Sequence, residues 1–306
     1  MTNPIILLGQ TAVGKTALSI ELARQINGEI ISADSMQVYR GMNIGTAKPS
    51  PEERKGVPHH LIDIRNPDEA WTVSDFVGQA NSLTSELANV GKIPIIVGGT
   101  GLYLWSLLEG FSFPIIEGND EVRARLNSFP TLELYSKLIT IDPKAAEKIN
   151  ANDKKRIIRA LEVFELTGKP ITELQKQNQT TNDIPHLSVG YNKTIIGLTL
   201  PKDILYDRIN IRVEAMIKNG LIDEVQGLIA KGYSKDLKAF QALGYKEAIA
   251  LLDGLWTKEQ MIEELKKRTR NFAKRQMTWF KRFDKVSWID ASSKPLENML
   301  ELIRKT

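Results

Sequence analysis

The feature that most constrains the fold is a glycine-rich loop near the amino terminus, set between an apolar run and an amphipathic helix pattern. The apolar run is Pro4–Leu8, and the helix pattern extends from Ala17 to Ile26. Glycines let the backbone wrap closely around an anion, and the start of a helix points unpaired N–H groups at it. A lysine adds positive charge, and a threonine hydroxyl suits Mg²⁺. The sequence therefore predicts a phosphate cradle made of Gly9, Gln10, Thr11, Ala12, Val13, Gly14, Lys15 and Thr16.

Length and composition exclude several classes of protein. A chain of 306 residues can form one large or two smaller domains. It has no cysteine, which excludes disulfides, thiol catalysis and Cys-ligated zinc. No apolar run approaches the length of a membrane helix, and the first residues do not form a signal peptide. We therefore expect a cytoplasmic protein with no membrane partner.

The apolar segments predict an α/β fold with a P-loop NTPase-like parallel sheet flanked by helices. Strands are expected at Ile5–Leu8, Glu29–Asp34, Ile93–Gly99 and Thr194–Leu200. Between the third and fourth strands the pattern becomes helical, with Asp142 opening one helix and Asn152 or Asp153 capping another that stops near Gly168. The expected core domain is therefore residues 1–112 and 191–306, interrupted by a smaller all-helical domain at residues 113–190.

A long basic helix is expected from about Lys258 to Phe283. Residues 111–306 hold 33 of the 41 basic residues but 26 of the 37 acidic ones. Clustered cations are what phosphate contacts require, and residues 153–159 form a second candidate. A merely solvated surface is the alternative. The helix carries eight cations, Lys266, Lys267, Arg268, Arg270, Lys274, Arg275, Lys281 and Arg282, while Ile262, Leu265, Phe272, Trp279 and Phe283 are spaced to face the protein.

Asp34 and Thr100 are expected to converge near the phosphate cradle. Each follows a strand, and ligands of open α/β sheets gather at the carboxyl ends of the strands. The third strand ends in glycine and hydroxyl residues rather than the carboxylate typical of an NTPase. Asp34 could act as a general base toward a substrate nitrogen or hydroxyl. It could equally be an indirect Mg²⁺ ligand or a cap for the turn that follows it.

Two further pairs of residues each have two possible roles. Arg208 and Arg212 lie one helical turn apart and could clamp a leaving phosphate or diphosphate, or could pair with surface carboxylates. His59 and His60 are adjacent on an expected strand, where their side chains point apart. Packing or hydrogen bonding is favoured over metal binding for this pair.

The chain resembles the bacterial tRNA dimethylallyltransferase family in blocks that span nearly its whole length in the family's order. The phosphate loop alone is widespread, whereas the second and fifth blocks together are highly specific. The blocks are Gly9–Thr16, Asp34–Tyr39, Gly45–Pro49, His59–Asp63, Gly98–Tyr103, Arg156–Val163, Gly220–Val225, Leu243–Glu247 and Lys274–Phe280.

The resemblance implies transfer of a dimethylallyl group from dimethylallyl diphosphate to the exocyclic amine of the adenosine next to the anticodon, at tRNA position 37. The loop would then hold a diphosphate leaving group rather than ATP. In the family the adenine is flipped into a channel through the core, and the prenyl diphosphate enters from the other side. Asp34 would orient and deprotonate the amine, with Thr100 beside it. Lys15, Arg212 and Thr16 with Mg²⁺ would neutralise the departing diphosphate.

The same resemblance implies a monomer that contacts the anticodon stem-loop, partly through the inserted domain. The sequence departs from the family pattern at Gln10, Val13, Lys246 and Glu247, and Lys246 could weaken a bidentate contact to RNA. The expected tRNA-contacting residues are Asp34, Ser35, Met36, Gln37, Thr100, Arg123, Lys155, Arg156, Arg159, Gln241, Gly244, Tyr245, Lys246, Lys274, Arg275, Gln276 and Lys281.

Two rival functions share the same phosphate loop. A small-molecule or nucleoside kinase would bind ATP and transfer its phosphoryl group, with no use for a basic carboxyl-terminal helix. A non-catalytic RNA-binding protein would use nucleotide only as a switch, and its handling of RNA would not depend on the Asp34 carboxylate.

Overall fold

The computed structural model describes residues 3–109, 116, 118–180, 187 and 192–305, which fall into two compact units. The core unit comprises Met1–Leu107 and Leu187–Thr306, and the inserted unit comprises Leu108–His186. Within the described ranges, no helix has the length and apolar character needed to cross a membrane.

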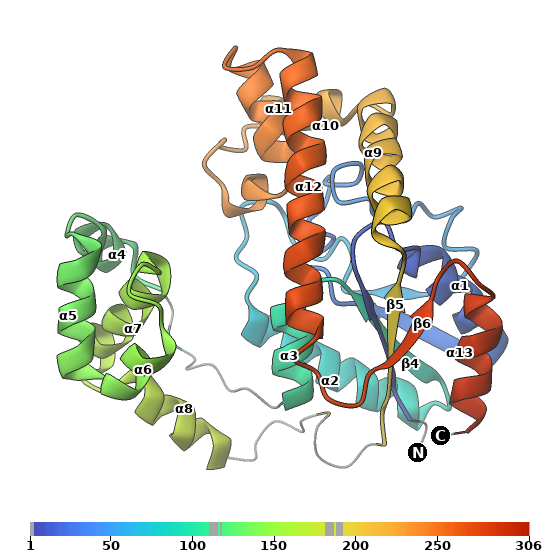
Figure 1. Ribbon diagram of the computed structural model, residues 1–306, viewed down its shortest axis with the longest axis horizontal. Helices are drawn as coiled ribbons and strands as arrows, with labels where there is room; N and C mark the ends of the chain where they lie inside the picture. Colours follow the sequence, from blue (N-terminus) through green and yellow to red (C-terminus); the bar gives the residue numbers. More distant parts are fainter. Residues whose placement is uncertain (1–2, 110–115, 117, 181–186, 188–191, 306) are drawn as a thin grey trace. The chain divides into compact units, whose positions relative to one another are not determined.

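A six-stranded parallel sheet forms the centre of the core unit (Figure 1). Its spatial order is β3-β2-β4-β1-β5-β6, so the strand that leads into the phosphate loop lies inside the sheet. The four long strands follow the expected segments, because each is an apolar run buried on both faces. The strands are β1 (Ile5–Gly9), β2 (Gly28–Ser32), β3 (His59–His60), β4 (Ile93–Gly98), β5 (Thr194–Thr199) and β6 (Ser287–Asp290).

Helices cover both faces of the sheet. Alternate strand residues such as Leu7 and Val97 pack with α1 and α13, whereas α2 packs against β2 and β4 from the other face, as Figure 1 shows. Phe76 of α2 stacks on Tyr103 of α3 at a centroid distance of 4.5 Å. The helices that flank the sheet are α1 (Lys15–Ile26), α2 (Val73–Asn89), α3 (Gly101–Glu109) and α13 (Pro295–Arg304).

A second group of helices in the core unit builds its own apolar cluster beyond the sheet. Phe240 and Tyr245 are fully buried there and stack at 6.2 Å, with Val38 and Leu265 in the same cluster. The long helix α12 also contacts α9 and β1, so it connects this cluster to the sheet. The elements are α9 (Lys202–Lys218), α10 (Leu221–Ala230), the short 3₁₀ helix Lys238–Gln241, α11 (Tyr245–Leu252) and α12 (Lys258–Phe280).

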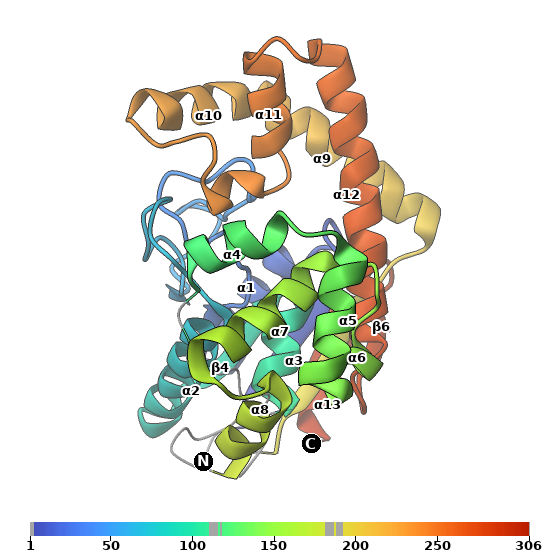
Figure 2. The ribbon, with the colours of Figure 1, turned by 90° about the vertical axis from the view of Figure 1, so that its left-hand side faces the viewer.

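The inserted unit is helical throughout its described elements. Figure 2 shows its helices, of which α5 and α7 pack side by side. As the sequence predicts, Asp142 caps α6, Asp153 caps α7, and Gly168 ends α7 with a φ of +70°. The elements are α4 (Asp120–Asn127), α5 (Thr131–Ile141), α6 (Pro143–Lys148), α7 (Lys154–Thr167) and α8 (Ile171–Thr180).

A buried carboxylate fastens this unit internally. The Glu162 side chain is fully buried and lies 2.8 Å from Arg123 Nε and 2.7 Å from Arg159 Nη1. It also accepts a hydrogen bond from the backbone N–H of Asn119 at 2.8 Å. Burial alone would raise the pKa of Glu162, but these hydrogen bonds outweigh burial and lower it.

Replacing Glu162 with glutamine is expected to destabilise the inserted unit by about 3 kcal/mol, because two guanidinium groups lose their shared carboxylate. Glu165→Gln is the matched control, since Glu165 pairs with Arg125 at the surface and its loss should cost less than about 1 kcal/mol. Urea unfolding and amide hydrogen exchange over residues 120–165 of the full chain measure both. Equal effects of the two substitutions would contradict this role for Glu162.

Candidate active site

The phosphate loop connects β1 directly to α1. Gly14 has a φ of +106° and stands at the start of α1, a conformation that strongly favours glycine. Gly9 is also tightly surrounded, because a Cβ there would lie 3.0 Å from both the Leu198 carbonyl oxygen and a Val13 methyl group. The first N–H groups of α1 thus face the hollow of the loop, as anion binding at a helix start requires.

Lys15 is folded onto its own loop. Its Nζ donates hydrogen bonds to the carbonyl oxygens of Gly9 at 2.7 Å and Gln10 at 2.9 Å. Burial lowers the pKa of Lys15 to about 7, with a further lowering from Arg212 and an opposing effect from Asp34. A bound anion would therefore draw a proton onto this amine.

Arg212 brings a second positive charge to the same place from α9. Burial lowers the pKa of its guanidinium, and Asp34 opposes that effect. Arg208, one turn earlier, donates a weak hydrogen bond to the Val13 carbonyl oxygen at 3.5 Å. In the described ranges neither arginine forms an ion pair, whereas Glu214 pairs with Lys266, so the surface-pair alternative is not observed.

Asp34 is held at the carboxyl end of β2. Its Oδ1 accepts hydrogen bonds from the backbone N–H groups of Met36 at 2.8 Å and Gln37 at 3.3 Å. Asp34 therefore does cap the following turn, one of the alternatives left open by the sequence. In the part of the chain that the structure describes, Oδ2 accepts no hydrogen bond, which leaves an oxygen available to a substrate.

Thr100 lies next to this turn because β2 and β4 approach very closely. A Cβ on Gly98 would lie 2.3 Å from the Ala33 carbonyl oxygen, so only glycine allows the approach. Thr100 Oγ1 accepts a hydrogen bond from the backbone N–H of Ser35 at 3.1 Å. The convergence expected for Asp34 and Thr100 is therefore present.

A cavity of about 350 Å³ brings these groups together, and we call it the Asp34 cavity. It combines hydroxyl, carboxylate and guanidinium groups with apolar wall, as sites for a polar organic substrate do. Its lining includes Thr11, Asp34, Ser35, Met36, Thr100, Arg212, Gln241, Thr269, Phe272 and Arg275.

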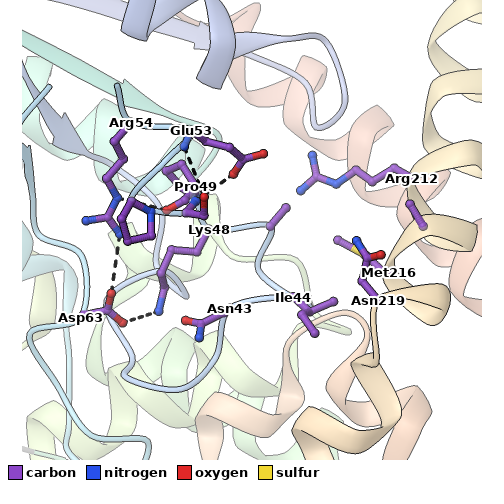
Figure 3. Close-up of a pocket in the computed structure, with 14 residues that line it drawn as sticks. Asn43, Ile44, Lys48, Pro49, Glu53, Arg54, Asp63, Arg212, Met216 and Asn219 are labelled. Atoms are coloured by element: carbon purple, nitrogen blue, oxygen red, sulfur yellow. Dashed lines mark hydrogen bonds and ion pairs between the residues drawn. The ribbon is translucent and has the colours of Figure 1, made fainter. Parts of the chain in front are cut away.

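A second cavity, of about 800 Å³, reaches Arg212 from another direction, and we call it the Lys48 cavity. In Figure 3 Arg212 extends into it from α9, across from Lys48 and Arg54. The Lys48 ammonium is 2.6 Å from both Asp63 Oδ1 and the Tyr39 carbonyl oxygen. Arg212 lines both cavities, so the two cavities share this side chain.

Metal binding can involve only a few of these residues. Among the described residues, no three His, Asp or Glu side chains are grouped as a metal cage. His59 Nδ1 lies 2.8 Å from the Val57 carbonyl oxygen and His60 Nε2 lies 2.8 Å from Glu29, which confirms hydrogen bonding for this pair. Thr16 is exposed at the start of α1, where its hydroxyl can join an ion that arrives with a phosphate.

The cations of α12 divide into two groups. In the first half of the helix, Lys266, Lys267 and Arg268 pair with carboxylates at 2.9–3.2 Å. Toward the end of α12 and directly after it, within the described ranges, Lys274, Arg275, Lys281 and Arg282 form no ion pair. This second group therefore offers uncompensated charge to a polyanion.

These unpaired cations do not all face the same cavity. Arg275 lines the Asp34 cavity, whereas Lys274 and Lys281 line a separate groove of about 300 Å³ together with Lys202 and Tyr206. Phe272 also lines the Asp34 cavity, although its spacing predicted core packing. Trp279 does pack inside the core unit, against Gly101 of α3. A Cβ added to Gly101 would lie 2.5 Å from the Cβ of Trp279.

Several residues expected to contact tRNA have partners within the protein. Tyr245 is fully buried and donates a hydrogen bond to Glu224, which also accepts from the loop N–H groups of Asn43–Gly45. Gly244 is buried beside it, whereas Lys246 and Gln241 are exposed. The segment around Tyr245 thus supports the loop of the Lys48 cavity.

Arg123, Arg159, Gln37 and Gln276 also have partners within the protein. The two arginines hold Glu162 inside the inserted unit, where Lys155 and Arg156 are exposed. The Gln37 amide lies 3.4 Å from the Thr46 and Ala47 carbonyl oxygens, and Gln276 is 4% exposed. Motif position alone did not separate these inward-facing side chains from outward-facing ones.

Above the pKa of Lys15, binding of an anion should be accompanied by uptake of a proton by the Lys15 amine. At about pH 8 the free amine is mostly neutral and a bound diphosphate restores its proton, whereas at about pH 6 the proton is already present. Calorimetric titration with inorganic diphosphate in two buffers of different ionisation enthalpy measures the uptake, and Lys15→Met isolates the contribution of the lysine. Identical uptake at the two pH values, after subtraction of that variant, would contradict the lowered pKa.

Comparison with known proteins places the chain among enzymes of one kind. The sequence profile of the family described as IPP transferase matches residues 37–283. A tRNA dimethylallyltransferase of Thermoanaerobacter sp. strain X514 is 48% identical over 93% of this chain and 90% of the relative. One from Alkaliphilus oremlandii is 47% identical over 98% of this chain and 96% of the relative.

Solved structures agree. The full-length tRNA isopentenylpyrophosphate transferase of Bacillus halodurans superposes with a TM-score of 0.72 at 43% identity, covering 100% of this chain and 95% of that one. A eukaryotic dimethylallyltransferase acting on tRNA superposes with a TM-score of 0.81 at 29% identity, covering 98% of this chain and 78% of the other.

Proposed function

This chain belongs to the IPP transferase family of tRNA dimethylallyltransferases, and on that basis we propose that it transfers the dimethylallyl group of dimethylallyl diphosphate to N6 of the adenosine next to the anticodon. Diphosphate is the other product. The kinase alternative is not favoured, because the relatives over nearly the whole chain are prenyltransferases.

The observation that carries the proposal is the placing of Arg212 between two cavities. The Asp34 cavity offers a carboxylate and a hydroxyl, which suit an adenine amine and its ring. The Lys48 cavity offers Arg212 beside Lys48 and Arg54, which both pair with Asp63, and the phosphate loop offers backbone N–H groups; guanidinium and N–H groups suit a diphosphate. Two substrates entering separately can therefore meet at Arg212.

The reaction then balances without a further reactant. The adenosine N6 nitrogen attacks the first carbon of the prenyl group, and the bond from that carbon to the diphosphate oxygen breaks. The electron pair leaves with the oxygen, next to Lys15 and Arg212, whose charges stabilise the departing anion. Asp34 accepts the proton that the nitrogen loses.

We propose that Mg²⁺ binds together with the diphosphate. Thr16 fits this role because it is an exposed residue with a hydroxyl group at the start of α1, and diphosphate oxygens and water would complete the coordination. When bound, Mg²⁺ would neutralise charge on the leaving group.

Recognition of tRNA is proposed to use exposed groups from both units. In the core unit the exposed residues are Gln241, Lys246 and Arg275, with the half-buried Ser35 and Met36 beside Asp34, and in the inserted unit they are Lys155 and Arg156. Every group assigned to the chemistry comes from one copy of the core unit, so we expect an active monomer, and a cytoplasmic one, since tRNA is its substrate.

The direct test is incubation with dimethylallyl diphosphate, Mg²⁺ and unmodified tRNA, followed by mass spectrometry of the tRNA nucleosides. We expect a C₅H₈ addition to adenosine. Absence of the adduct from several tRNAs with adenosine at position 37, together with robust turnover of ATP, would favour the kinase.

Asp34→Asn should lower single-turnover transfer by about 100-fold or more while tRNA affinity stays within about twofold. Asparagine keeps the oxygen that accepts from Met36 and Gln37, so the turn is retained, but it cannot take the proton. Asp68→Asn, at an exposed position of the same unit, is the matched control and should be neutral. An unchanged rate in Asp34→Asn would rule out a general base at this position.

Arg275→Gln should weaken tRNA binding by about tenfold and lower the salt slope by about one unit, because Arg275 is unpaired at the Asp34 cavity. Lys274→Gln, the neighbouring cation in the separate groove, should weaken binding by less than about threefold. Fluorescence titrations at several salt concentrations measure both. If the lysine variant were the weaker binder, the RNA would lie along the other face of α12.

A further inference from the structure

One buried amide joins three parts of the active site. Gln276, on α12, is 4% exposed. Its Oε1 accepts a hydrogen bond from the backbone N–H of Thr11 at 2.8 Å, and its Nε2 donates to the Gly99 carbonyl oxygen at 2.9 Å. Thr11 belongs to the phosphate loop, and Gly99 directly precedes Thr100. The side chain therefore ties α12 to the diphosphate end and to the amine end of the site.

The two partners require an amide in one orientation. Thr11 presents a donor and Gly99 presents an acceptor, so Gln276 must place its oxygen toward the loop and its nitrogen toward the strand end. A Cβ on Gly99 would lie 2.3 Å from Gln276 Nε2, so this approach depends on a glycine. Neither a carboxylate nor an apolar side chain makes both contacts.

A second glutamine strengthens the same junction from the loop side. Gln10 is 9% exposed, and its Nε2 donates to the Ala273 carbonyl oxygen at 2.9 Å. Ala273 lies three residues before Gln276, on the same helix. The phosphate loop is thus held to α12 at two consecutive residues, Gln10 and Thr11.

We propose that Gln276 is a positioning residue for prenyl transfer, an inference that rests on the proposed function. It does not touch a substrate but acts through Thr11 and Gly99. By fixing these two backbone groups on one helix, it sets the distance between the diphosphate and the amine held beside Thr100. Small displacements of reacting groups lower rates steeply, so loosening this junction should affect turnover more than binding.

Gln276→Met tests the idea by keeping the length of the side chain and removing both hydrogen bonds. We expect single-turnover transfer at saturating substrates to fall about 30-fold, tRNA affinity to stay within about twofold, and amides of residues 9–16 to exchange faster. Asn271→Met, at an exposed position of α12, is the control and should change none of these. An unchanged rate, or lost tRNA affinity at an unchanged rate, would overturn the proposal.

Gln276→Glu provides a second, independent test. The ionised carboxylate has no proton for Gly99, whereas the protonated form has one acceptor and one donor and can restore both contacts. We therefore expect the rate relative to wild type to rise as the pH falls from about 8 to about 5.5, because burial raises the pKa of a carboxyl group. A ratio that does not vary with pH would contradict the proposal.

The outcomes also separate this inference from the proposed function. A wild-type protein that transfers nothing refutes the proposed function, and the exchange of loop amides in Gln276→Met still decides whether the junction holds the loop. A wild type that transfers normally, with a variant that does so equally well, refutes only the role of Gln276.

Discussion

The active site depends on the balance between two partly desolvated cations, Lys15 and Arg212, and one carboxylate, Asp34. Burial lowers the pKa of both cations, which means that their positive charge is costly until an anion arrives. Asp34 offsets only part of this cost. A diphosphate supplies the missing negative charge, and the same cations stabilise it as it leaves.

The parallel sheet makes this arrangement possible. The buried strands β1, β2 and β4 bring their carboxyl ends to one edge, so the phosphate loop, Asp34 and Thr100 meet there although they are far apart in sequence. Arg212 is added from α9, and α12 supplies Phe272 and Arg275. Helix α12 therefore has two tasks, since it lines the Asp34 cavity and anchors the phosphate loop through Gln276.

Much of this could be predicted from sequence, for identifiable reasons. Long apolar strands and the phosphate loop have strong local signals, and the convergence of Asp34 with Thr100 follows from parallel topology. The two-residue strand β3 and the partly exposed β6 have too short a pattern to be predicted with the others. The motif blocks predicted a tRNA contact for Gln276 and Tyr245 as well as for their exposed neighbours. A motif gives the amino acid at each position but not the direction in which its side chain points. Phe272 shows the reverse error, since apolar spacing predicts an inward face without distinguishing a core from a cavity wall.

The central claim is that a diphosphate leaves carbon beside Lys15 and Arg212 while an adenosine amine replaces it. Phosphorus NMR of a single turnover, with dimethylallyl diphosphate, tRNA and ATP all present, tests this most directly. The account predicts one inorganic diphosphate released for each adenosine modified, with the ATP resonances unchanged. Release of phosphate from ATP, with the prenyl diphosphate left intact, would contradict it.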